Sequence, residues 1–294
     1  MTHPPSISEK AQLSDGEAKF KHPEIEADKN EVVVSLGNAK VHIYDRLDGN
    51  TRKATFFPWE RPIRGLHYLC RAPKLLLFDE WLVVAYQHEP LLRIVDRLDY
   101  DTVVCEKVLG TEAEVPRGKD GTLWMGLLKL TNGESDQFLL ASHTNMEVFE
   151  ISQNGCGASF QSVLTIPMPN ETISSVAVDK GKIYVTSQTP KQIQVLSAQD
   201  GSSITTQDLR FRPGIIRVHE HWVFVSNDEG NRQNEQIVPD RYQPFQVYRA
   251  DDLGTQWFVV QGLSTSKFYY NSQMYYGYIV SSFSQARQES GYVI

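Results

Sequence analysis

The chain has 294 residues, of which 40% are apolar and 22% charged, so it can bury the core of one large domain. Its net charge of −7 argues against the broadly cationic surface that binds nucleic-acid phosphates. No stretch approaches the roughly 20 apolar residues that cross a membrane, and the N-terminal segment lacks the apolar core of a signal peptide. We therefore expect a cytoplasmic or nuclear protein without a membrane or nucleic-acid partner.

The N-terminal segment differs in amino-acid composition from the rest of the chain. Residues 1–18 are polar and contain Pro4, Pro5 and the turn pair Asp15-Gly16, which predicts a mobile tail. From residue 19 to 294, short runs rich in Val, Ile, Tyr and Phe alternate with turn residues, without any linker between them. This pattern predicts one all-β domain. The residues before Glu24 are candidates for a strand that completes its last unit.

Two series of strand-like runs recur along this domain. The first series consists of compact apolar runs, typical of strands buried on both faces, at 31–35, 81–87, 137–143, 182–188, 222–227 and 276–282. In the second series apolar and polar residues alternate, at 40–45, 91–96, 145–150, 192–197 and 245–250. Residues 173–180 and 214–220 are candidates for a strand that precedes a unit.

A turn signal and a further β-prone run complete each unit. Acidic residues follow the last apolar anchor of the second series, and in one unit Asn154-Gly155 takes their place. They are Asp48, Asp99, Asp200 and Asp252. Such residues favour tight hairpin turns. The unit is therefore strand, loop, strand, turn, strand.

The units repeat with a regular period. Successive anchors lie about 50 residues apart, which is typical of propellers and other repeat arrays. These anchors are Tyr44, Val95, Phe149, Leu196 and Tyr248. Units made only of strands favour a single β-propeller of four-stranded antiparallel blades. We expect six blades, with seven as the alternative if a further blade lies within 56–74 or near 111–129.

One unit resembles a known repeat family. Residues 174–201, SSVAVDKGKIYVTSQTPKQIQVLSAQDG, resemble an NHL or YVTN-type propeller repeat. The segment VHIYDRLDG at 41–49 is similar to the end of a WD40-type blade, although the Gly-His and Trp-Asp signatures of WD40 repeats are absent. The resemblance implies a propeller with a tendency toward protein binding.

Polar residues in the loops between the second and third strands of the predicted blades form the candidate site. A rigid scaffold that displays many loops suits recognition of proteins or peptides. We therefore expect a non-catalytic interaction module, such as a scaffold or a substrate receptor, without a cofactor. The candidate partner-binding residues are Gln87, His88, His143, Asn145, Gln188, Asn227, Asp228 and Arg232.

The alternative is a metal-dependent hydrolase or lactonase with a divalent ion in the central channel. Loop residues with oxygen ligands, among them Glu89, Asn145, Glu171 and Asp228, are of the type that hard cations bind. The pair His219 and His221 lacks a third ligand and falls at an expected hairpin turn. Because these residues are also ordinary loop residues, we expect binding rather than catalysis.

Overall fold

The computed structural model describes residues 24–35, 41–46, 52–56, 72–87, 90–109, 123–130, 136–154, 157–168, 171–219, 221–227, 245–254 and 256–260. The regular structure of these residues is β-strand throughout. None of them belongs to a helix with the length and apolar character that crossing a bilayer requires.

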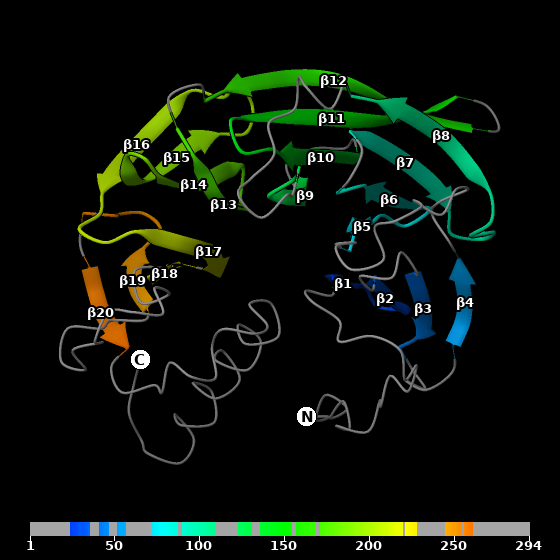
Figure 1. Cartoon of the computed structure of the whole chain (residues 1–294), viewed down its shortest axis with the longest axis horizontal. Coiled ribbons are helices and arrows are strands. Elements are labelled where there is room, and N and C mark those ends of the chain that lie inside the picture. The colour runs from blue at the N-terminus through cyan, green and yellow to red at the C-terminus, as the bar shows by residue number, and fades with distance from the viewer. Residues whose placement is uncertain are drawn as a thin grey trace, which may run out of the picture. The chain divides into compact units, whose positions relative to one another are not determined.

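The described strands form five four-stranded antiparallel sheets, in each of which the strands lie side by side in chain order (Figure 1). We name these sheets blades A to E. Blade A contains β1 (Glu24–Ala27), β2 (Glu31–Ser35), β3 (Val41–Asp45) and β4 (Arg52–Phe56). Blade B contains β5 (Lys74–Leu77), β6 (Trp81–Ala85), β7 (Leu91–Asp96) and β8 (Val103–Val108). Blade C contains β9 (Gly126–Leu130), β10 (Asp136–Ala141), β11 (Asn145–Asn154) and β12 (Gly157–Pro167). Blade D contains β13 (Ile173–Asp179), β14 (Lys182–Gln188), β15 (Lys191–Ser197) and β16 (Ser203–Asp208). Blade E contains β17 (Pro213–His219), β18 (Trp222–Asn227), β19 (Phe245–Arg249) and β20 (Gln256–Val260).

The chain divides into two compact units. The first comprises Met1–Leu127 and Ile151–Gln161, and the second comprises Leu128–Glu150 and Ser162–Ile294. Blades A and B belong to the first unit, blades D and E belong to the second, and the residues of blade C are shared between them.

The strand predictions are confirmed in all five blades, but the predicted number of blades is not. The two series of runs form the second and third strands of each blade, and the runs after the turns form the fourth. The described residues make five blades rather than six or seven. The sixth was inferred from residues 276–282 alone, without the alternating strand and turn that mark the other five. Those residues, like residues 1–18, lie outside the described residues.

The predicted turns have the backbone geometry that their residues favour. Lys180 and Gly181 join β13 to β14 with φ angles of 45° and 77°. At the next hairpin Gly201 has a φ of 73°, and Oδ1 of Asp200 accepts a 3.0 Å hydrogen bond from the backbone nitrogen of Ser202. The hydrogen bonds from Ser202 also hold the pKa of Asp200 below its usual value. Asp99 acts in the same way in blade B, where its Oδ2 accepts a 2.6 Å hydrogen bond from Oγ1 of Thr102.

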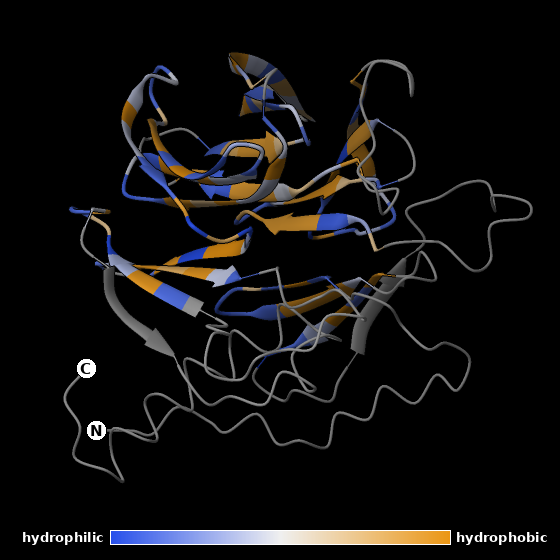
Figure 2. Cartoon of the chain, turned by 60° about the vertical axis from the view of Figure 1, so that its left-hand side comes forward, coloured by the Kyte–Doolittle hydropathy of each residue, from blue (hydrophilic) through white to orange (hydrophobic). Residues whose placement is uncertain are grey.

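The first unit has a core that joins blades A and B. Val33 and Ile43 of blade A pack in one cluster with Leu75, Leu82 and Val84 of blade B. The first strands β1 and β5 lie next to each other, which identifies them as the inner strands of these two blades. Orange and blue residues alternate along many of the strands in Figure 2, as expected for sheets with apolar and polar positions in turn.

A buried ion-pair cluster fastens blade A to blade B. The side chain of Arg97 is only 7% exposed and lies 2.7 Å from both Asp28 and Glu31. The hydroxyl of Tyr100 donates a 2.5 Å hydrogen bond to the same Glu31 oxygen. Burial by itself lowers the pKa of Arg97, but the hydrogen bonds to Glu31 and Asp28 outweigh it, so the pKa is raised above its usual value. The cluster therefore favours the charged form of Arg97.

The second unit repeats this arrangement between blades D and E. Tyr184 and Val195 of blade D pack with Ile216, Val223 and Tyr248 of blade E in one buried cluster. The inner strands β13 and β17 lie next to each other. In blade D, β13, β14 and β15 carry mostly buried residues, whereas β16 is exposed along nearly all of its length. The outer strand therefore forms the rim of the blade.

Candidate functional site

Backbone hydrogen bonds join three segments of the second unit into one surface. The segments are the loop 142–145 of blade C, the connection between blades C and D at 168 and 171–172, and the loop 188–190 of blade D. The nitrogen of Met168 donates to the carbonyl oxygen of Thr144 at 2.8 Å, and the nitrogen of Gln188 donates to the carbonyl oxygen of Thr172 at 3.0 Å. We call this surface the loop face. Because backbone hydrogen bonds hold its segments together, the surface is preorganised by the fold itself.

The loop of blade C is shaped by the hydroxyl group of Ser142. This oxygen accepts a hydrogen bond from the backbone nitrogen of Asn145 at 3.1 Å and also donates to the side-chain oxygen of Asn145. Ser142 is buried, whereas Asn145 is exposed and His143 is half-buried. The Ser142 hydroxyl is therefore used within the turn and stabilises the loop from its buried side. His143 and Asn145 form the accessible part of the loop.

The loop of blade D is fixed in a similar way. The hydroxyl of Ser187 donates a 2.9 Å hydrogen bond to the carbonyl oxygen of Pro190, which follows a cis peptide bond after Thr189. Oε1 of Gln188 accepts a hydrogen bond from Arg212, which precedes β17 of the next blade. Thr189 and Pro190 are exposed and form the tip of this loop.

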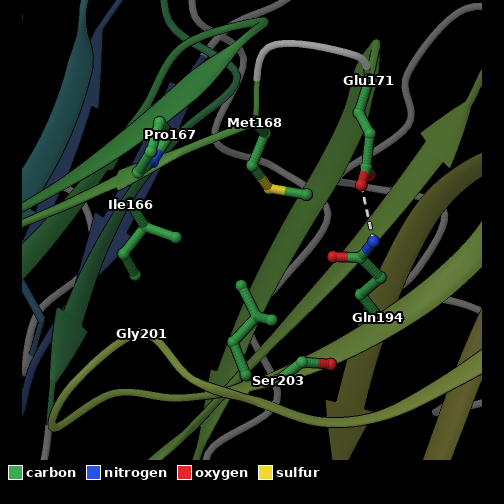
Figure 3. Close-up of a pocket in the computed structure, with 8 residues that line it drawn as sticks. Ile166, Pro167, Met168, Glu171, Gln194, Gly201 and Ser203 are labelled. Carbon is green, nitrogen blue, oxygen red and sulfur yellow. Dashed lines mark hydrogen bonds between the residues drawn. The ribbon is translucent and has the colours of Figure 1, made fainter.

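A groove opens beside the loop face, between the end of β12 and the strands β15 and β16. We call it the rim groove. It has a volume of about 180 Å³. Figure 3 shows its lining residues. They are Ile166, Pro167, Met168, Glu171, Gln194, Leu196, Gly201 and Ser203.

The shape of the rim groove depends on a close approach between blades C and D. An added Cβ atom at Gly201 would lie 2.9 Å from Cγ1 of Ile166, which is closer than side chains come in practice. Gly201 also has a positive φ, a conformation that glycine adopts without strain. The Asp200-Gly201 turn was predicted from the sequence, but its packing against Ile166 was not.

Glu171 places a carboxylate in the rim groove, whose lining combines apolar and polar residues. Its Oε1 accepts a 2.6 Å hydrogen bond from Nε2 of Gln194, drawn as a dashed line in Figure 3. Its Oε2 is buried and has no hydrogen-bond partner among the described residues. A buried carboxylate oxygen without a donor is energetically unfavourable. Oε2 therefore retains an unused capacity to accept a hydrogen bond among the described residues.

The structure distributes the candidate partner-binding residues over several blades. His143, Asn145 and Gln188 come together on the loop face. Asn227 ends β18, where it lies opposite Pro213. His88, Asp228 and Arg232 lie outside the described residues. His219 ends β17 and His221 directly precedes β18, and both are exposed, in agreement with the predicted hairpin between the two strands.

Gln87 has a structural role that the sequence did not reveal. It is only 2% exposed, its Oε1 accepts 3.1 Å hydrogen bonds from the backbone nitrogens of Leu123 and Trp124, and its Nε2 donates to the carbonyl oxygen of Trp124. Its amide thus fastens the loop after β6 to the segment before β9. Gln188, the last residue of β14, has the corresponding place in its blade and also reaches toward the next blade through Arg212. Because its amide is buried, Gln87 supports the scaffold and does not present a contact surface.

Comparisons with known proteins identify the fold. No family model matches the chain, and no curated protein matches it in sequence. A chain in the crystal structure of the mitotic checkpoint complex is similar to it with a TM-score of 0.56 and 13% sequence identity, over 82% of this chain and 67% of that one. The chain has the fold of a WD40-like β-propeller. Because 1137 solved chains match this arrangement, the likeness does not by itself select a function.

The WD40-like propeller shows no metal-binding cluster in its described parts. No group of three or more His, Cys, Asp or Glu side chains there could hold a metal ion. Glu171, a candidate ligand in the hydrolase alternative, is paired with an amide in the rim groove and not with further carboxylates. The sequence pointed to Glu171 as a loop carboxylate, but it gave no sign that Ile166, Met168 and Leu196 would surround it.

Proposed function

We propose that this WD40-like propeller is a non-catalytic protein-interaction module, with a scaffold or a substrate receptor as its concrete form. The loop face is its docking surface, and its partners are proteins or peptides. The proposal includes a cytoplasmic or nuclear location, which imaging of a fluorescent fusion tests.

The observation that carries this proposal is the continuity of the loop face. Two loops from neighbouring blades and the connection between them are joined by backbone hydrogen bonds of 2.8 to 3.3 Å. Polar side chains that are exposed or half-buried, His143, Asn145 and Gln188, project from this backbone. A surface of this kind offers donors and acceptors in fixed positions, which lowers the entropic cost of association.

The similarity in fold supports the same proposal. The solved chain is part of the mitotic checkpoint complex, which is a protein assembly by its own name. A WD40-like propeller can therefore act within a multiprotein complex.

Affinity capture from cell extract followed by mass spectrometry tests the proposal. The full-length chain serves as bait beside the variant His143→Ala/Asn145→Ala. The variant His219→Ala/His221→Ala is the matched control. It changes exposed residues beside the connection between β17 and β18, and this connection lies at the opposite end of blade E from the loop between β18 and β19. We expect proteins that are retained by the wild type and the control and lost from the loop-face variant. Equal retention by all three baits would contradict the assignment of the loop face.

A further inference from the structure

The rim groove contains a charged group that the fold leaves incompletely paired. Gln194 holds one oxygen of Glu171 at 2.6 Å, and Oε2 of the same carboxylate is buried without a hydrogen-bond partner in the described part of the chain. The backbone nitrogen of Glu171 donates to the carbonyl oxygen of Met168 at 3.1 Å, which holds the backbone of Glu171 at the upper end of the groove in Figure 3. A cationic donor in the groove would satisfy this oxygen.

One wall of the groove suits an apolar chain. Ile166, Met168 and Leu196 are buried hydrophobic residues that line it. Gln194 uses its amide nitrogen for Glu171, so its amide oxygen is available as a second acceptor, and Ser203 lies exposed at the other end. The groove therefore combines an apolar wall with acceptors close to a negative charge.

A lysine side chain matches this combination better than an arginine side chain does. Lysine carries a compact ammonium group on a four-carbon stem, whereas the guanidinium of arginine pairs best with two carboxylate oxygens at once. Only one oxygen of Glu171 is left without a partner, because Gln194 occupies the other. Met168 is adjacent to Glu171, and its flexible unbranched side chain can move to admit the ammonium group.

We propose that the rim groove binds the side chain of a lysine residue in a peptide segment of a partner protein. The lysine stem lies against Ile166, Met168 and Leu196, and the ammonium group donates to Oε2 of Glu171. This inference rests on the proposed function, since the loop face next to the groove would contact the rest of the partner.

Methyl NMR on the full-length chain tests the inference. The protein is labelled with ¹³C at the methionine methyl groups, and the Met168 signal is assigned with the variant Met168→Leu. The probe is N-acetyl-lysine methylamide. N-acetyl-norleucine methylamide, which has the apolar stem without the ammonium group, and the arginine analogue are the comparison compounds.

We expect the lysine probe to shift the Met168 methyl signal in a saturable manner, with an affinity at least about tenfold higher than that of the norleucine probe. The variant Glu171→Gln should weaken lysine binding by a similar factor, whereas the matched control Glu147→Gln, on β11 outside the groove, should not change it. The melting temperature of Glu171→Gln should stay close to that of the wild type, because the amide oxygen of the variant can still accept the hydrogen bond from Gln194.

Three outcomes would overturn the inference: no saturable shift of the Met168 signal, equal binding of lysine and norleucine, or unchanged binding by Glu171→Gln. Tighter binding of the arginine probe would overturn the choice of lysine. These outcomes are independent of the capture experiment, whose variants leave Glu171 intact. A result that contradicts lysine binding in the rim groove is therefore distinguishable from a result that contradicts partner binding by the loop face.

Discussion

Nη2 of Arg97 lies 2.7 Å from Oε2 of Glu31, and this pair joins the turn that follows β7 of blade B to the second strand of blade A. Both side chains are almost completely buried, at 7% and 10% exposure. Replacing Arg97 with alanine would leave Glu31 buried without its counter-charge.

We expect Arg97→Ala to lower the free energy of unfolding by about 3 to 5 kcal/mol, measured by urea denaturation. Arg97→Lys retains the charge but loses the planar fork that contacts both Asp28 and Glu31, so it should have a smaller effect. A loss below about 1 kcal/mol for Arg97→Ala, the range of exposed pairs, would show that the pair is solvated in solution.

The buried amide of Gln87 predicts a loss of stability on substitution. Gln87→Ala removes the hydrogen-bond partners of the backbone groups of Leu123 and Trp124, which then remain unsatisfied. We expect a loss of about 2 to 3 kcal/mol in thermal or urea unfolding. Thr189→Ala, on an exposed residue of the loop face, serves as the control and should change stability by much less. Equal stability of the two variants would refute this role of Gln87.

The contact between Gly201 and Ile166 predicts a strong effect of a single methyl group. Gly201→Ala adds a Cβ atom at 2.9 Å from Cγ1 of Ile166 and places alanine at a φ of 73°. We expect a destabilisation of about 1 to 3 kcal/mol, measured by calorimetry or denaturation. The steric part of this destabilisation should disappear in a protein that also carries Ile166→Ala. The losses of stability caused by the two substitutions should therefore not be additive. Additive effects would assign the whole cost to the backbone conformation.

The buried hydroxyl of Tyr248 predicts a loss of stability at high pH. Burial raises the pKa of Tyr248 to about 12, whereas an unfolded chain gives tyrosine a pKa of about 10. The neutral form is therefore favoured in the folded protein, and this stabilisation is complete below about pH 10 and is lost as the pH rises toward about 12. The free energy of unfolding should fall more steeply over this interval in the wild type than in Tyr248→Phe. Parallel curves for the two proteins would exclude Tyr248 as the group responsible.

Local sequence patterns were sufficient to predict the strands. The alternation at 192–197 and the Asp200-Gly201 turn depend on neighbouring residues, and both appear in the structure as β15 and the hairpin that follows it. The same applies to the repeat anchors from Tyr44 to Tyr248, each of which lies in the third strand of its blade. A period of about 50 residues is therefore enough to indicate blades. The period did not give the number of blades, because residues 276–282 show the signal of one strand without the alternating strand and the turn that mark the other units.

The sequence by itself determined the β-strands, the hairpin turns and the blade unit, since side-chain alternation and positive φ angles are properties of a few consecutive residues. Only the tertiary structure decided that Gln87 is buried, that Arg97 pairs with Glu31, and that Glu171 faces Gln194 beside Gly201. Each of these relationships joins residues from different blades or connections. They follow from how neighbouring blades pack, and this packing depends on the whole set of apolar side chains between the sheets.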